Sequence, residues 1–332
     1  MLGQERAKLL LAAAFAPERL GHAYLFTGPD GVGKTLLAQE AAQALLCRGD
    51  GARPCGACQD CRLFAHDSHP DFLLLEPEGD SRVIKIDKIR DLIHTLSLMP
   101  VQGDRRVAIL RDADALNEEA ANALLKTLEE PPASALLILT SSRPRALLPT
   151  LRSRCQEIRF EPLSAEHLRA ILDDRPGLDE EDVAAAVRLA GGSADRALQL
   201  IESGCLEIRR KTLARILALP TEDVFEIADD VLDWAKAASK QYEPQRERLR
   251  AFFYMLESTY RDIMVRAVGD GKEAMPEAGV PLPDGAQRLA PQRLLGIHEA
   301  LCDARRQIDA NATIDFVLQD LFERIARLQQ AT

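Results

Sequence analysis

The segment from Gly28 to Thr35 has residue types and a spacing that could bind a polyphosphate. It reads Gly-Pro-Asp-Gly-Val-Gly-Lys-Thr and fits the pattern Gly-x-x-x-x-Gly-Lys-Thr without a mismatch. Glycines let the backbone turn its N–H groups around phosphates, while the lysine reaches the outer phosphates and the threonine holds Mg²⁺. The candidate ligand is ATP or ADP with Mg²⁺. Its candidate binding residues are Gly28, Gly31, Val32, Gly33, Lys34 and Thr35.

This motif is a phosphate loop only where it joins a strand to a helix. An apolar run, Ala23 to Phe26, precedes it, and a helical pattern from Leu36 to Leu46 follows it. The alternative is a glycine-rich turn that arose by chance. The context favours a nucleotide pocket, but it leaves open whether the protein hydrolyses what it binds.

Four of the seven cysteines lie close together in the sequence, in a pattern that could hold a metal ion. After Cys47 come two Cys-x-x-Cys steps, Cys55 to Cys58 and Cys58 to Cys61. Four thiolates with no open coordination position are typical of structural zinc. An iron–sulfur cluster and four reduced thiols without metal are the alternatives. We expect one zinc ion that stabilises a small insertion at about 47–61 and does no catalysis.

The residues after the apolar run at 106–110, which predicts a buried strand, argue against catalysis. Phosphate-loop ATPases carry Asp-Glu at this point, where the Asp positions magnesium and the Glu polarises the attacking water. Arg111 and Asp112 take these two places here. The magnesium carboxylate is therefore missing and the base is shorter, and a misplacement of about 1 Å can reduce a rate about 100-fold.

The elements that must position these residues alternate between strands and helices. Apolar runs at 71–75, 106–110 and 135–140 predict strands, and the pattern at 117–130 predicts a helix that Pro131-Pro132 ends. From Ser164 onward the pattern is helical, with breaks expected at Pro176-Gly177 and in a Gly/Pro-rich loop at 269–285; the first helix is expected to end near Pro17. This order predicts an α/β nucleotide-binding domain with a parallel sheet and helical additions.

Composition excludes several broad classes of protein. The chain has 332 residues, 46% of them hydrophobic, so two or three folded domains are expected. The net charge of −10 makes it a poor stand-alone nucleic-acid binder. No apolar run reaches membrane-spanning length and no signal-peptide pattern opens the chain, so we expect a cytoplasmic protein.

Four segments of the chain have a distinctive combination of sequences: His22-Ala-Tyr-Leu-Phe26, the four-cysteine insertion, Asn122-Ala-Leu-Leu-Lys-Thr-Leu-Glu-Glu-Pro-Pro132 and Ser153-Arg154-Cys155. Together they resemble the bacterial clamp-loader family of AAA+ proteins, and the resemblance covers about residues 1–205. It implies an AAA+ P-loop domain at 1–161 with the zinc-binding insertion, a three-helix lid at 162–205, and an all-α oligomerisation collar at 206–332.

The family contains an ATPase motor, gamma/tau, and a sibling subunit with a degraded site. The chain resembles the sibling for three reasons: Arg111-Asp112 replaces Asp-Glu, the chain starts almost at Gly3-Gln4 with little room for the longer N-terminal lead of gamma/tau, and it ends at 332 without a long extra tail. The resemblance implies a five-membered ring with gamma/tau and delta subunits in the DNA polymerase III holoenzyme. Such a ring opens the sliding clamp and closes it around primed DNA.

The resemblance also implies a role for Arg154, which would reach the ATP of a neighbouring subunit as an arginine finger in trans. Such a group is worth about 10³–10⁵ in rate in related systems. The alternative for Arg154 is a surface arginine or a local ion pair with Glu157. Asp195 stands where the motor carries a second arginine, and Arg196 is one step, or about 100°, further round the helix.

The resemblance thus favours an assembly protein that hydrolyses little or no ATP, so whether it counts as an enzyme is open. One alternative is an active gamma/tau-like ATPase with Asp112 as its base. A zinc-dependent nucleic-acid-binding module is a third possibility, which the acidic charge opposes.

Overall fold

The computed structural model describes residues 1–15, 20–77, 83–173, 175, 178–219, 221–237, 242–268 and 289–330. The chain folds into two compact units, Met1–His167 and Leu168–Thr332. The breaks predicted near Pro17, at Pro176-Gly177 and at 269–285 lie outside the described residues. A division of the second unit into lid and collar stays a prediction.

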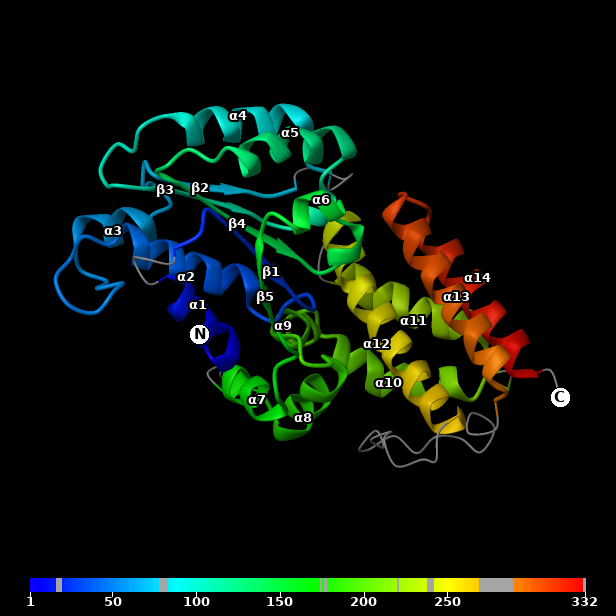
Figure 1. The fold of residues 1–332 in the computed structure, drawn as a ribbon. Helices are drawn as coiled ribbons and strands as arrows, with labels where there is room; N and C mark the ends of the chain where they lie inside the picture. The colour runs from blue at the N-terminus through cyan, green and yellow to red at the C-terminus, as the bar shows by residue number, and fades with distance from the viewer. Residues whose placement is uncertain are drawn as a thin grey trace. The chain divides into compact units, whose positions relative to one another are not determined.

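The first unit is built on a parallel sheet of five strands in the order β2-β3-β4-β1-β5 (Figure 1). Strand β1 lies between β4 and β5, with Ala23 opposite Leu137 and Thr27 opposite Ser141 on the β4 side. Strands β1, β3 and β4 are buried along their whole length, which explains their continuous apolar sequences. The strands are β1 (Ala23–Thr27), β2 (Phe72–Leu75), β3 (Arg106–Leu110), β4 (Ala135–Ser141) and β5 (Gln156–Arg159).

Alternate side chains of β1, β3 and β4 enter two separate cores, because successive residues of a strand point to opposite faces. Tyr24 and Phe26 pack with α1 (Glu5–Ala14) and α2 (Lys34–Leu46). Ala23 and Leu25 pack in the other core, with α4 (Ile86–Ser97), α5 (Glu118–Glu129) and α6 (Pro149–Arg152). Figure 1 shows α4 and α5 on one side of the sheet and α1 and α2 on the other.

Local sequence signals account for the ends of α5. The Asn117 side chain caps the helix by accepting the N–H of Ala120 at 2.9 Å, and two acidic residues occupy the first turn. Pro131-Pro132 follows the last turn and cannot continue the helix. Within the cysteine insertion lies α3 (Gln59–Ala65), which the sequence did not predict.

The second unit is helical throughout its described part. Its buried apolar side chains come from every helix, among them Leu213 of α10, Phe252 of α12 and Leu321 of α14. No helix in the described residues is long and apolar enough to cross a membrane. The remaining helices are α7 (Ala165–Asp173), α8 (Glu180–Leu189), α9 (Ala194–Glu202), α10 (Cys205–Leu217), α11 (Val224–Ala237), α12 (Tyr242–Val268), α13 (Pro291–Asp309) and α14 (Ile314–Gln330).

Candidate functional site

The phosphate loop joins β1 to α2, as its motif requires. Gly28 follows the strand and donates its N–H to the carbonyl of Ser141 at 3.3 Å, at the carboxyl end of the neighbouring strand β4. Gly33 has φ 94° and stands at the N-cap of α2, so a residue with a side chain would be strained there. The helix then begins at Lys34. The loop therefore lies where ligands bind in open parallel sheets, at the carboxyl ends of the strands.

Lys34 folds back onto the loop that precedes it. Its ammonium donates to the carbonyl oxygens of Gly28 at 2.8 Å and Pro29 at 2.6 Å, and its side chain is only 6% exposed. Asp30 lies 4.0 Å from the same ammonium. The positive charge that could meet phosphates thus lies at the loop, held by the loop's own carbonyls.

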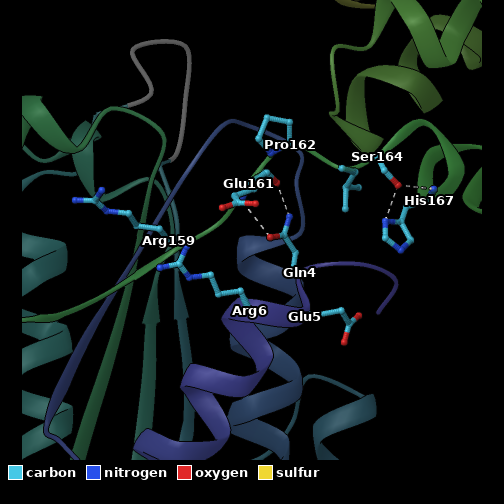
Figure 2. A pocket seen from close by; sticks show the side chains of 9 residues that line it. Gln4, Glu5, Arg6, Arg159, Glu161, Pro162, Ser164 and His167 are labelled. Atoms are coloured by element: carbon cyan, nitrogen blue, oxygen red, sulfur yellow. Dashed lines mark hydrogen bonds between the residues drawn. The ribbon is translucent and has the colours of Figure 1, made fainter.

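Gln4 ties the phosphate loop to the segment after β5, and sequence reasoning did not assign it this place. Its amide donates to the carbonyls of Val32 at 3.2 Å and Glu161 at 2.6 Å, and accepts the N–H of Glu161 at 3.1 Å. Figure 2 shows Gln4 facing Glu161 at the edge of a cavity of about 260 Å³ that Arg6, Arg159 and His167 also line. The two partners are 28 and 157 residues away in sequence, so no local pattern predicts these bonds.

Arg111 and Asp112 follow β3, two strands away from β1 in the sheet order. Arg111 pairs with Glu76 at 3.0 Å and lies 3.9 Å from the carboxylate of Asp112. Asp112 has φ 50° and donates its backbone N–H to the hydroxyl of Thr140 at 3.1 Å. The position expected to hold a magnesium carboxylate therefore holds a cation engaged with acidic groups.

Asp114 is connected to the phosphate loop, and sequence reasoning missed it. It accepts the hydroxyl of Ser141 at 2.6 Å and the guanidinium of Arg143 at 2.9 Å, and the carbonyl of the same Ser141 accepts Gly28. Burial pushes the pKa of Asp114 upward, but the bonds from Ser141 and Arg143 outweigh burial and the pKa is lowered. The carboxylate is thus anionic at neutral pH. A polar residue just past the end of a buried strand was the available signal.

Arg154 follows α6 and is one-third exposed. Its guanidinium donates to the carbonyl of Thr150 at 2.8 Å and to the carboxylate of Glu129 at 2.5 Å. The alternative partner expected from the sequence, Glu157, was wrong: Glu157 instead accepts Thr27 at 2.9 Å and lies 3.3 Å from Arg159. Arg154 thus lies partly exposed, with its guanidinium in contact with both α5 and α6.

The four cysteines Cys47, Cys55, Cys58 and Cys61 come together as predicted. Their sulfur atoms all lie within 4.8 Å of one another, with 3.8 Å between Cys47 and Cys58 and 4.0 Å between Cys55 and Cys61. Four sulfurs about 2.3 Å from one tetrahedral zinc ion would be about 3.8 Å apart. The cluster therefore has the size of a closed tetrahedral site and could bind a metal ion.

Backbone N–H groups point at the sulfurs and favour their anionic form. Cys55 donates to Cys47 at 3.4 Å, Cys58 to Cys55 at 3.3 Å, and Cys61 to Cys58 at 3.4 Å. The bond from Cys61 lowers the pKa of Cys58 to about 6, whereas burial raises the pKa of Cys61 to about 12. A bound cation would favour the thiolate at both. Burial also raises the pKa of Cys205, outside the cluster, to about 12, as expected of an ordinary buried thiol.

Known proteins are similar to this chain over most of its length. The family model described as DNA polymerase III, delta subunit, matches residues 3–164. DNA polymerase III subunit delta' of Escherichia coli is 30% identical over 325 residues, which cover 96% of this chain and 93% of that protein. The chain belongs to the family of DNA polymerase III delta' subunits. The delta' subunit of Pseudomonas aeruginosa is 39% identical over 208 residues, a match that spans 61% of this chain and 62% of that protein, less than two thirds of its length.

Other DNA polymerase III subunits and a solved structure are also similar to this delta' family member. DNA polymerase III subunit tau of Escherichia coli is 34% identical over 235 residues, covering 67% of this chain and 36% of that protein. A crystal structure of a gamma subunit-related protein from Thermotoga maritima has a TM-score of 0.51 at 18% identity, covering 98% of this chain and 100% of that one. The predicted fold class, an AAA+ α/β domain with a parallel sheet followed by helices, is confirmed.

In the second unit, Arg196, which follows Asp195 in α9, takes part in helix packing. The guanidinium of Arg196 lies over the ring of Tyr254, 4.7 Å from its centroid, and donates to its hydroxyl at 3.3 Å. That hydroxyl in turn donates to the carbonyl of Leu189 at 3.0 Å. Arg196 thus links α9 to α12 and, through Tyr254, to α8. Its guanidinium is engaged in these contacts within the second unit.

Proposed function

We propose that the chain acts as the delta' subunit of a clamp loader, within a hetero-pentameric ring with gamma/tau and delta subunits. In this role it helps load the sliding clamp onto primed DNA as part of the DNA polymerase III holoenzyme. The observation that carries the proposal is the likeness to the Escherichia coli delta' subunit along 96% of the chain. The likeness to tau subunits supports partners of the gamma/tau type.

We propose further that the chain binds ATP or ADP at the phosphate loop but hydrolyses little or none of it. The loop has the required glycines, and Lys34 lies at it with its ammonium buried. Arg111 stands where a motor would hold magnesium, and it is paired with Glu76. A cation at that point repels Mg²⁺. The carboxylate that would position the metal for hydrolysis is also missing there.

Arg154 supplies the chain's contribution to catalysis, at a neighbouring subunit's nucleotide. Its exposure leaves the guanidinium accessible, and the bonds to Thr150 and Glu129 limit the directions in which it points. A positioned guanidinium stabilises the charge that develops on a transferring phosphoryl group. The role is argued from the Ser153-Arg154-Cys155 match and this geometry together.

The metal held by the four cysteines is zinc in this proposal. Four thiolates and a tetrahedral spacing suit zinc, which supplies no redox chemistry and would hold the insertion in one shape. The chain's own residues do the rest: backbone N–H groups at Cys55, Cys58 and Cys61 stabilise negative sulfur.

Reconstitution tests the role in the ring. Clamp loading onto primed DNA by gamma/tau and delta subunits should require this chain, while the chain alone should turn over ATP no faster than its Lys34→Ala variant. Loading that proceeds without the chain would refute the ring role. Turnover at the rate of a gamma/tau motor, lost in Lys34→Ala and in Asp112→Asn, would instead establish the alternative of an active ATPase.

A further inference from the structure

The loop between α4 and β3 presents apolar side chains to solvent. Within residues 98–103, named here the apolar loop, Leu98 is 48% exposed, Met99 is 82% exposed and Val101 is 68% exposed. The polar backbone of the same loop points inward instead. An arrangement with backbone inside and apolar side chains outside needs polar partners beneath the loop, because buried backbone groups require hydrogen bonds.

Two charged side chains at the edge of the sheet supply part of this support. The carboxylate of Asp71, which has no exposed surface, accepts the N–H groups of Val101 at 2.6 Å, Gln102 at 2.8 Å and Gly103 at 3.3 Å. The guanidinium of Arg106 donates to the carbonyl of Met99 at 3.1 Å and to Asp71 at 3.3 Å. Asp71 and Arg106 therefore hold the backbone of the apolar loop by hydrogen bonds.

The third support comes from the cysteine insertion. Arg48, next to Cys47, donates to the carbonyl of Gln102 at 2.7 Å. The same guanidinium forms a two-pronged pair with Asp60, with Nε 2.9 Å from Oδ2 and Nη2 2.8 Å from Oδ1. Asp60 lies between Cys58 and Cys61 and is 3% exposed. Arg48 thus connects the metal-binding segment to the backbone of the apolar loop.

A second connection runs through His69. Its Nδ1 accepts the backbone N–H of Asp71 at 3.1 Å, and its Nε2 lies 3.6 Å from the carboxylate of Asp60. The His69 side chain is 1% exposed. Asp60 therefore contacts both routes that lead from the cysteine cluster to Asp71 and the loop.

We propose that Arg48 and Asp60 are positioning residues through which the metal held by the four cysteines fixes the apolar loop. The inference rests on the proposed metal site. The metal sets the path of the chain from Cys47 to Cys61, that path sets the Arg48–Asp60 pair, and the pair holds the carbonyl of Gln102. Loss of the metal then releases one of the loop's three charged supports and leaves Asp71 and Arg106 in place.

Hydrogen–deuterium exchange of the full chain tests this link, read on the peptide that covers residues 98–103. Arg48→Ala should keep its zinc, because Arg48 donates no ligand, yet exchange about tenfold faster in that peptide. Wild-type protein treated with a chelator should show the same increase. The matched control is Arg62→Ala, because Arg62 donates to Ala57 within the same insertion at 3.0 Å; its exchange should equal that of the wild type.

Zinc content, measured on every sample, separates the two proposals. Wild-type protein purified without chelator that carries no zinc would refute the metal site itself. Zinc-loaded Arg48→Ala with wild-type exchange, or chelated wild type with unchanged exchange, would refute the link while leaving the metal site standing. Loss of zinc from Arg48→Ala would show that Arg48 is part of the site, which also overturns the inference.

Discussion

Arg154 donates a hydrogen bond to the carboxylate of Glu129, with 2.5 Å between Nη2 and Oε1. Glu129 is the last residue of α5, and this contact aims an arginine that follows α6. The pair is exposed, so its contribution to stability is small. Its significance lies in the direction that it imposes on the guanidinium.

Arg154→Ala should leave the fold intact and lower the DNA- and clamp-stimulated ATPase of the reconstituted ring at least about tenfold, since related fingers contribute about 10³–10⁵. Glu129→Ala should lower it less, because the guanidinium is kept but no longer aimed. Arg145→Ala, an exposed arginine just before α6, is the matched control. Unchanged ring ATPase in Arg154→Ala would contradict the assignment.

Lys34→Ala should weaken binding of ATP and ADP to the isolated chain at least about tenfold, because the ammonium is the nearest positive side chain to the loop carbonyls. Fluorescent-nucleotide titration, with and without Mg²⁺, measures it. Lys126→Ala on the surface of α5 serves as the comparison variant. Equal affinity in Lys34→Ala and wild type would show that the loop is no nucleotide site.

Asp114→Asn should destabilise the chain by about 2 kcal/mol near neutral pH, because it removes a buried charge that Ser141 and Arg143 satisfy. The folded pKa of Asp114 is depressed, so its stabilisation is complete above the unfolded pKa of about 3.9 and is lost as the pH falls through the folded pKa. Urea unfolding should therefore show a gap between wild type and variant that narrows below about pH 4. A gap in unfolding free energy that widens as the pH falls would contradict a depressed pKa of Asp114.

Much of this fold follows from sequence, because the strands next to the phosphate loop are continuous apolar runs and α5 has both a capping Asn117 and a terminating proline pair. The phosphate loop and the four cysteines could be predicted because each is a local pattern with fixed spacing. The sheet order of the strands is not local. Contacts across it, such as those of Asp114 with Ser141, therefore could not be predicted.

The alternative that Arg154 pairs with Glu157 was wrong for the same reason, because sheet pairing is not local in sequence. Glu157 is close to it in sequence, but β5 pairs with β1 and the side chain of Glu157 turns to Thr27. Glu129 is distant in sequence and is brought close by the packing of α5 beside α6. Closeness in sequence therefore does not predict the partner of a side chain on a strand, because strand pairing decides which residues it meets.

Cys58→Ser should reduce bound zinc from about one ion per chain to nearly none, because a closed site needs all four thiolates. Metal analysis after chelator-free purification measures this. Cys302→Ser on α13 lies outside the cluster and should keep a full complement. Full zinc in Cys58→Ser would exclude the four-cysteine arrangement.

Gly28→Ala should destabilise the chain by about 2–4 kcal/mol, because φ is 150° and the new Cβ would lie 2.5 Å from the carbonyl oxygen of Phe160. Gly51→Ala has φ 95° and open space around it, so only backbone strain of about 1 kcal/mol is expected. Urea unfolding compares them. A smaller effect at Gly28 than at Gly51 would contradict the packing argument.

The order of strands has a consequence for how such a protein can change over generations. Arg111 and Asp112 lie beyond the end of β3, and the pair of Arg111 with Glu76 lies at the surface. In the proposed role, a substitution of Arg111 is free to alter hydrolysis, because it leaves the contacts of the phosphate loop unchanged. The pocket itself has no such freedom, because Gly28 contacts Phe160 and Gln4 joins Val32 to Glu161. A phosphate loop of this kind can thus keep its shape whether or not the protein hydrolyses nucleotide.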